Sequence, residues 1–198
     1  MKKVSIIGAT GYAGAELLRI LHNHPEAEVV HITSESHAGE AISDIYPHLK
    51  GIYDQKLMSM KDIETIGQDS DFVFIGLPHG HAMKVGKALE NMPTRIIDLG
   101  ADYRFNDTDI YEAWYKVPHT HKDAPRVYGL AELNREQIKD AKIIGNAGCY
   151  TTASILALAP LAKHHLIDVN TIIIDAKSGV SGAGRSAKQA NHFPELYD

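Results

Sequence analysis

The stretch "GATGYAG", residues 8–14, decides the fold expected for this chain. It directly follows the apolar run "KVSII" (3–7) and opens "GYAGAELLRILHNH" (11–24), where leucine and isoleucine recur at helical spacing. Gly8 permits a tight turn, Gly11 lets a pyrophosphate approach the backbone, and Gly14 allows the helix to pack closely on the strand. The helix N-terminus presents free N–H groups and a positive dipole end to phosphates. The stretch therefore predicts a dinucleotide-binding turn; the alternative is the same turn without a ligand.

Apolar runs of the same kind recur along the chain and alternate with helical stretches. Short continuous runs of Val and Ile are typical of strands buried on both faces and hence parallel. Strands that alternate with helices predict βαβ units, so the expected fold is an α/β, doubly wound, Rossmann-type and mostly parallel sheet. Further strands are expected at 28–33, 71–77, 94–100, 142–148 and 171–177, and further helices at 81–91 and 149–165.

Three segments depart from that simple alternation. The stretch 102–128 is polar and aromatic without clear periodicity, so we expect an excursion over the edge of the sheet, with "YEAWY" as one helical turn. Pro160 lies inside the helix at 149–165 and should kink or divide it. The segment "SGVSGAGRSAK" (178–188) is expected to be a glycine-rich loop.

The chain is expected to hold one domain and part of another. Residues 1–147 form the expected nucleotide-binding domain, and residues 148–198 form the expected start of an α+β catalytic domain. The sequence ends at "HFPELYD", without a final strand or helix to close a second sheet. We therefore expect the second domain to be truncated.

Composition narrows the class of protein. The 198 residues are 44% hydrophobic and 23% charged, which is usual for a soluble globular protein. A net charge of −5 gives no global electrostatic case for nucleic acid, and no apolar run reaches the length of a membrane span. One cysteine cannot form an internal disulfide, so a reducing, cytoplasmic location is expected. The 12 histidines show no metal-ligand pattern, and no metal is expected.

The end of the second strand bears on the choice between NAD and NADP. An acidic residue about 20 positions past the last glycine bonds the ribose hydroxyls in NAD-binding proteins. Glu35 stands at that distance, but Thr33, Ser34 and Ser36 beside it suit a 2′-phosphate. Spacing alone leaves both cofactors open, and Glu35 as a solvated loop carboxylate is a third possibility.

The single cysteine, Cys149, lies between the last strand of the first domain and a long helix, in "GNAGCYTT" (145–152). A thiolate at a helix start is stabilised by backbone N–H groups and the helix dipole. Gly148 leaves room beside the sulfur for a substrate carbonyl, and Asn146 with the amides after Cys149 is placed to support an oxyanion. Ligands gather at the C-terminal ends of such strands, which favours a nucleophile over a small buried hydrophobic residue.

A dinucleotide and a thiol together indicate one reaction class, in which the thiol attacks an activated acyl group and hydride then reduces the thioester. Six segments carry a resemblance that fits this chemistry: "GATGYAGAELLRIL" (8–21), "GLPHG" (76–80), "DLGADYRF" (98–105), "YGLAEL" (128–133), "GNAGCYTTASILALAPL" (145–161) and "SGVSGAGR" (178–185). They resemble the N-acetyl-gamma-glutamyl-phosphate reductases of arginine biosynthesis, relatives of aspartate-semialdehyde dehydrogenase. Gly-Cys-Tyr at 148–150 distinguishes the former from the latter.

The resemblance implies NADPH-dependent reduction of N-acetylglutamyl 5-phosphate to the 5-semialdehyde, with release of phosphate. It implies that Cys149 is the catalytic nucleophile and that Arg104, Asn146 and Glu132 lie at the substrate. The implied cofactor-binding residues are Gly8, Thr10, Gly11, Tyr12, Ala13, Gly14, Ser34, Ser36, Ser181, Gly182, Ala183 and Gly184. Glu35 stands where the family often has Arg, which keeps NAD open.

The resemblance also bears on partners and on the general base. It implies a small-molecule acyl-phosphate substrate and a homo-oligomer for the full-length enzyme. Net charge and the lengths of the apolar runs predict no nucleic-acid or membrane partner. The family's general-base histidine is expected beyond residue 198, and His192 is the nearest candidate within the sequence. Two alternatives stay open: a nucleotide-binding fragment without turnover, and a related acyl-phosphate reductase of the lysine-pathway or aspartate-semialdehyde type.

Overall fold

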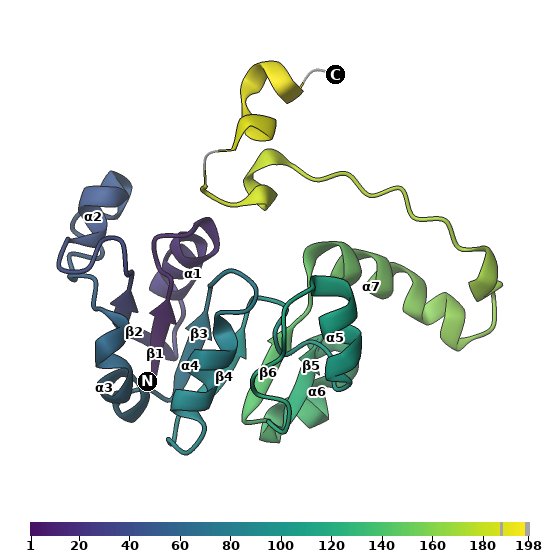
Figure 1. Cartoon of the computed structure of the whole chain (residues 1–198), viewed down its shortest axis with the longest axis horizontal. Coiled ribbons are helices and arrows are strands. Elements are labelled where there is room, and N and C mark those ends of the chain that lie inside the picture. The colour runs from purple at the N-terminus through teal and green to yellow at the C-terminus, as the bar shows by residue number, and fades with distance from the viewer. Residues whose placement is uncertain (187, 197–198) are drawn as a thin grey trace. The chain divides into compact units, whose positions relative to one another are not determined.

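The computed structural model describes residues 1–186 and 188–196, and it confirms the expected doubly wound sheet (Figure 1). Six parallel strands lie in the order β2-β1-β3-β4-β6-β5. Because β2 lies on one side of β1 and all later strands lie on the other, the order in which the strands are added reverses between β1 and β3. Ligands of such sheets bind at that reversal. The strands are β1 (Lys2–Ile7), β2 (Ala27–Thr33), β3 (Phe72–Ile75), β4 (Arg95–Asp98), β5 (Arg126–Gly129) and β6 (Ile143–Asn146).

Helices connect the strands and bury apolar side chains against both faces of the sheet. Alternate residues of the strands enter two core clusters, one containing Ile6 with Leu18 of α1, the other containing Ile75 with Val85 of α4. A strand sends successive side chains to opposite faces, so a sheet covered on both sides needs apolar residues at nearly every position. The helices are α1 (Tyr12–His22), α2 (Ile42–Ile45), α3 (Ile63–Asp69), α4 (Ala82–Leu89), α5 (Thr108–Tyr115), α6 (Ala131–Asp140) and α7 (Cys149–Lys163).

The excursion at 102–128 holds more regular structure than its sequence predicts. It contains α5, which has eight residues where one turn was expected, and it leads into the edge strand β5. Its anchor is Asp102, a buried carboxylate that accepts hydrogen bonds from the N–H groups of Gly80 and Ala82 and from the hydroxyl of Tyr111. Because a polar group holds this segment in place, its sequence has no apolar periodicity, and the full length of α5 could not be predicted.

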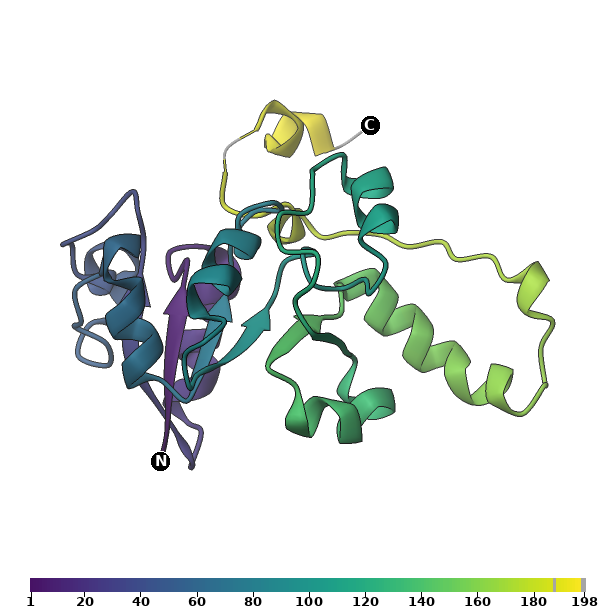
Figure 2. The same ribbon diagram turned by 60° about the horizontal axis from the view of Figure 1, so that its bottom comes forward.

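One expectation about the last fifty residues is wrong, and one of the two effects expected of Pro160 is not found. The predicted strand at 171–177 is absent, since residues 172–179 carry no regular structure (Figures 1 and 2). A strand requires a hydrogen-bonded neighbour, and none pairs with this segment in the described part of the chain; Ile173 is 94% exposed. Helix α7 is not divided at Pro160 and runs through it to Lys163.

The chain forms two compact units, residues 1–152 and 153–198. The first contains the whole sheet and α1 to α6. The second contains most of α7, the irregular segment and short 3₁₀ turns, among them Val180–Ala183. Among the described residues, no helix has both the length and the apolar character needed to cross a membrane.

Candidate active site

The predicted site residues of the first unit lie along one edge of the sheet. Parallel strands all end at the same edge, and each of these residues follows the end of a strand. The loop at 8–14 follows β1, Ser34 and Ser36 follow β2, Arg104 follows β4, and Cys149 follows β6. Glu132 lies in the first turn of α6, just after β5. The loop containing Ser181, Gly182, Ala183 and Gly184 belongs to the second unit, where these four residues are exposed.

The phosphate loop has the close contacts that its glycines suggest. Gly8 has φ +83°, and a Cβ there would lie 2.5 Å from the carbonyl oxygen of Gly76, the residue after β3. A Cβ on Gly14 would lie 2.6 Å from Ala9 Cα, so α1 starts directly against the turn. A Cβ on Gly11 would meet only the Gly8 oxygen, at 3.5 Å. Residue 11 therefore faces open space in front of the N-terminus of α1, where a phosphate fits.

Hydroxyl groups continue from this loop to the end of β2. Thr10 Oγ1 lies 3.0 Å from Ser34 Oγ, and Ser34 Oγ lies 3.4 Å from Ser36 Oγ. The hydroxyl of Tyr46 donates to the Thr10 carbonyl at 2.9 Å and fixes the loop from behind. Tyr12 and Ala13 are the first two residues of α1 and are exposed. These groups provide donors for a phosphate or for ribose hydroxyls.

Glu35 is directed away from the hydroxyl chain. Its Oε1 accepts the N–H of Met60 and, at 3.3 Å, the hydroxyl of Ser59. The carboxylate thereby caps the short 3₁₀ turn at Met60–Asp62 that leads into α3. An NAD-selective acid has its carboxylate free for the ribose hydroxyls, so this arrangement favours a local structural role for Glu35.

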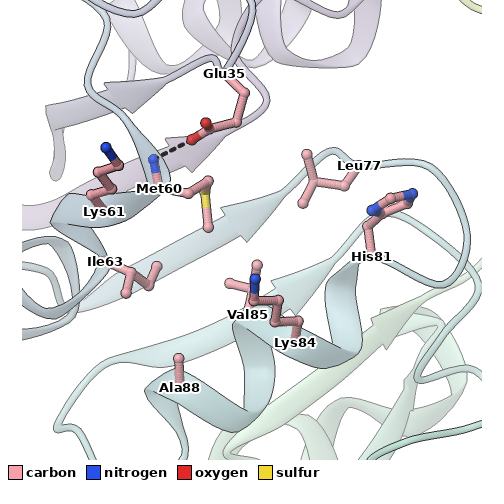
Figure 3. A pocket seen from close by; sticks show the side chains of 9 residues that line it. All are labelled: Glu35, Met60, Lys61, Ile63, Leu77, His81, Lys84, Val85 and Ala88. Carbon is pink, nitrogen blue, oxygen red and sulfur yellow. Dashed lines mark hydrogen bonds between the residues drawn. The ribbon is translucent and has the colours of Figure 1, made fainter.

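A cavity of about 460 Å³ opens beside Glu35, between the start of α3 and helix α4 (Figure 3). It lies by the loops after β2 and β3, the two strands that flank β1. Its apolar wall and its basic groups both suit a nucleotide, which has a flat base and charged phosphates. The lining residues are Glu35, Met60, Lys61, Ile63, Leu77, His81, Lys84, Val85 and Ala88.

Cys149 is exposed and is the first residue of α7. The N–H of Thr152 donates to the Gly148 carbonyl at 2.8 Å, so Gly148 closes the first turn of the helix. The thiol therefore lies at a helix N-terminus, open to a substrate, as the sequence predicts.

The guanidinium of Arg104 lies directly against the loop that carries Cys149. Its Nε donates to the carbonyl of Asn146 at 2.8 Å and its Nη2 donates to the carbonyl of Leu99 at 3.2 Å. A Cβ on Gly148 would lie 3.1 Å from Arg104 Nη1, a tight contact, so the glycine lets the arginine lie close to this loop. A guanidinium held against this loop can bind an anion there.

The two other predicted substrate residues are Asn146 and Glu132. The side-chain amide of Asn146 donates to the Ala147 carbonyl at 3.2 Å, while its backbone carbonyl holds Arg104. Glu132 is exposed on α6 at the same edge of the sheet. The structure thus brings Arg104, Asn146 and Cys149 together and leaves Glu132 one strand away.

Sequence reasoning missed Lys61 and Lys84, and it also missed Asp98. The lysines line the cavity beside Glu35, and nothing in their local sequence marks them, because the 3₁₀ turn before α3 and helix α4 meet only in the fold. Asp98 ends β4 inside the quoted segment "DLGADYRF" and is fully buried. A carboxylate at the end of an otherwise apolar strand is the sequence feature that could have identified Asp98. Within residues 1–186 and 188–196, no three His, Cys, Asp or Glu side chains cluster as metal ligands do.

Two family models match the chain. The model described as "Semialdehyde dehydrogenase, NAD binding domain" matches residues 3–141, and "Semialdehyde dehydrogenase, dimerisation domain" matches residues 149–198. The boundary between the two matches falls just before Cys149.

Curated relatives named N-acetyl-gamma-glutamyl-phosphate reductase match nearly the whole chain. The protein of Pelotomaculum thermopropionicum is 52% identical over 196 residues, 98% of this chain and 56% of the relative. That of Methanococcus maripaludis is 47% identical over 99% of this chain and 57% of the relative. The chain therefore spans a little over half the length of the curated relatives it matches.

Solved structures with the same fold include aspartate semialdehyde dehydrogenases. That of Candida albicans, solved with NADP, superposes with a TM-score of 0.58 at 22% identity, covering 83% of this chain and 47% of that one. The Vibrio cholerae enzyme gives the same TM-score at 18% identity, covering 82% and 47%. At such identity the likeness establishes the fold alone.

Proposed function

The chain belongs to the semialdehyde dehydrogenase family, and from that premise we propose that it is the cofactor-binding and thiol-bearing part of an N-acetyl-gamma-glutamyl-phosphate reductase. The reaction is NADPH-dependent reduction of N-acetylglutamyl 5-phosphate to N-acetylglutamate 5-semialdehyde, with release of phosphate. Relatives at about half identity carry that name. The observation that carries the proposal is an exposed thiol at the start of α7, with the Arg104 guanidinium against its loop, on the edge that also holds the phosphate loop.

The chemistry follows from that placement. The Cys149 sulfur attacks the acyl carbon, a carbon–sulfur bond forms, and the bond from carbon to phosphate oxygen breaks, with its electron pair leaving on phosphate. Arg104 binds the departing phosphate and neutralises its growing charge. The nicotinamide, when bound, supplies the hydride that reduces the thioester. Collapse of the reduced adduct returns the thiolate to Cys149 and releases the aldehyde.

Asn146 and Glu132 complete the proposed substrate site. Asn146 fixes Arg104 through its backbone carbonyl, and its amide lies three residues before the thiol, where an oxyanion develops. Glu132 is proposed to contact the amino-acid end of the substrate from the first turn of α6. General-base assistance by a histidine is part of the proposed mechanism.

The proposed cofactor is NADP(H). Its diphosphate is proposed to bind at Gly8–Gly14, and its ribose 2′-phosphate at Ser34 and Ser36, with Lys61 and Lys84 supplying positive charge from the adjoining cavity. Glu35 does not oppose the extra phosphate directly because its carboxylate is held by Met60 and Ser59. The glycine-rich turn at Ser181–Gly184 is proposed to approach the nicotinamide.

The proposed enzyme is organised in two domains. Residues 1–147 act as the cofactor domain and residues 148–198 begin the catalytic domain, which in the whole enzyme also forms a homo-oligomer, in keeping with the family description "dimerisation domain". The partner is a small acyl phosphate, with no role for nucleic acid or a membrane. The proposed place of action is the cytoplasm.

The decisive experiment separates acylation from reduction. The chain is incubated with N-acetylglutamyl phosphate without NADPH, and its intact mass is measured together with released phosphate. The expected result is one acyl group on Cys149 and one equivalent of phosphate, both lost in Cys149→Ala. A separate fluorescence titration with NADPH is expected to show binding in both proteins. Binding of NADPH without acylation would instead support a nucleotide-binding module, and preferential acylation by aspartyl phosphate would support the aspartate-semialdehyde type.

A further inference from the structure

Asp98 is a buried carboxylate that the proposed reaction does not use. It ends the central strand β4, where it is level with Ile75 of β3 and Gly145 of β6. Its exposed fraction is zero. Its Oδ1 accepts the N–H of Gly100 at 2.9 Å, and its Oδ2 has no hydrogen-bond partner among the described residues.

The turn that covers Asp98 is the turn that positions Arg104. Residues 99–104 fold back over the ends of β4 and β6, so closely that a Cβ on Gly145 would lie 2.1 Å from the Tyr103 carbonyl oxygen and 2.8 Å from the Arg104 nitrogen. The Arg104 N–H donates to the Ala101 carbonyl, and its guanidinium returns to the Leu99 carbonyl. One short segment therefore joins the buried carboxylate to the cation beside Cys149.

We propose that Asp98 is a positioning residue for Arg104, and that a proton on Asp98 and an anion at Arg104 stabilise each other. An ionised Asp98 holds a negative charge behind the anion site in a dry environment, where charges interact strongly. A neutral Asp98 removes that repulsion and keeps the hydrogen bond from Gly100. This inference rests on the proposed role of Arg104 as the phosphate-binding residue.

The surroundings of Asp98 place the pKa of its carboxyl group near neutral pH. The pKa of Asp98 is raised to about 7, chiefly by burial and also by the nearby charge of Asp102. The N–H groups of Gly100 and Tyr103 and the charge of Arg104 act in the opposite direction. The phenols of Tyr103 and of Tyr111 on α5 also face this region, and burial raises the pKa of both, so they remain neutral. The imidazole of His119 lies beside them, with its Nε2 2.8 Å from the Asp102 carbonyl oxygen, and burial lowers its pKa. Asp102 accepts hydrogen bonds from three donors, the N–H groups of Gly80 and Ala82 and the hydroxyl of Tyr111.

The direction of the effect follows from these charges. Asp98 is neutral below its pKa and ionised above it, so an anion at Arg104 binds more tightly in mildly acidic solution. Because linkage is reciprocal, binding of that anion must also raise the proton occupancy of Asp98. At neutral pH the chain therefore takes up protons as it binds the anion.

The test uses sulfate, whose charge stays constant in the range where phosphate titrates. Sulfate binding to the 198-residue chain is measured by calorimetry at about pH 6 and about pH 8, and at neutral pH in two buffers of different ionisation enthalpy. We expect affinity to fall about fivefold across this range, with proton uptake at neutral pH. In Asp98→Asn both effects should be lost, whereas Asp140→Asn, an exposed charge change on α6, should retain them.

The outcomes separate this inference from the proposed function. Sulfate that binds the wild-type chain and not Arg104→Ala, but without pH dependence or proton uptake, would overturn the link and leave Arg104 as the anion site. An equal pH dependence in Asp98→Asn would overturn it as well. If sulfate binds equally to Arg104→Ala, the assignment of Arg104 in the proposed function fails. Should Asp98→Asn not fold, as judged by circular dichroism, the proton uptake of the wild-type chain decides, and its absence refutes the link.

Discussion

At the scale of single residues, the loop at 8–14 contains one glycine that packing requires and one for which we propose a role in ligand binding. Gly14 has no room for a methyl group, because a Cβ would lie 2.6 Å from Ala9 Cα. Gly11 has room, with its nearest contact at an ordinary 3.5 Å. The two positions therefore allow stability and cofactor binding to be tested independently in the same loop.

We expect Gly14→Ala to lower the free energy of unfolding by about 2 kcal/mol, a usual cost for forcing atoms into a packed core. Gly11→Ala should cost less than about 1 kcal/mol, since it changes only an N-cap, but should weaken NADPH binding about tenfold or more by narrowing the approach to the backbone. Urea unfolding and fluorescence titration measure the two quantities. Equal loss of stability in both variants would contradict this reading of the loop.

The lysines of the cavity should affect cofactor choice. Losing a hydrogen bond from a charged group to phosphate costs enough to change affinity about tenfold. We expect Lys61→Met and Lys84→Met each to weaken NADPH binding by about that factor and to leave NADH binding unchanged. Lys87→Met, on the same helix α4 but outside the cavity lining, is the matched control. A parallel loss of NADPH and NADH binding would show that the lysines do not recognise the 2′-phosphate.

The exposed Cys149 should be more reactive than an ordinary thiol. Its position at the start of α7 places helix N–H groups beside the sulfur. We expect iodoacetamide to modify it about tenfold faster in the folded chain than in the same chain unfolded in urea, at neutral pH. Mass spectrometry over time measures the two rates. Equal rates, or slower reaction in the folded chain, would contradict the prediction of an unusually reactive cysteine.

At the scale of elements, the sequence predicts best where apolar side chains hold an element in place. β1, β3 and β4 were located to within a few residues because their Val and Ile runs face helices on both sides. α5 was underestimated and β5 and α6 were missed. β5 is half-buried along its length, and none of the described residues of α6 is buried, so neither carries a strong apolar pattern. The buried polar anchor of Asp102, which joins α4 to α5, cannot be recognised without the fold.

That anchor gives the prediction at this scale. Removing a buried carboxylate that accepts several hydrogen bonds leaves its donors unsatisfied, at about 3 kcal/mol or more. We therefore expect Asp102→Ala to lower the free energy of unfolding by about that amount and to increase amide exchange at the starts of α4 and α5. Tyr111→Phe, which removes one donor only, should cost about 1 kcal/mol. If the two substitutions prove equally mild, Asp102 is not what fixes this excursion.

At the scale of the whole molecule, the sequence predicts the placement of the expected site residues better than the structure of the second unit. The phosphate loop, Arg104 and Cys149 each follow a strand end, and parallel strands bring such ends together whatever the details of packing. The segment at 171–177 was predicted as a strand from "TIII" alone, but strand formation depends on a neighbouring strand that local sequence does not specify. The run of isoleucines correctly indicates that this segment is apolar, but it does not form the strand that the run predicts.

That apolar character leads to a prediction about association. Several large apolar side chains of the second unit are exposed, including Leu166 at 70%, Ile173 at 94% and Ile174 at 56%. Contiguous exposed apolar surface is usually covered by another protein surface, and the family model matching residues 149–198 is described as a dimerisation domain. We expect the 198-residue chain to self-associate at micromolar concentration, with Ile173→Lys shifting it toward monomer. Sedimentation velocity measures the shift, and urea unfolding should show that the first unit keeps its stability. Lys163→Ala, a charged-residue change in the same unit at the end of α7, serves as the control. A wild-type chain that remains monomeric at every concentration would refute the association, and unchanged association in Ile173→Lys would place the contact elsewhere.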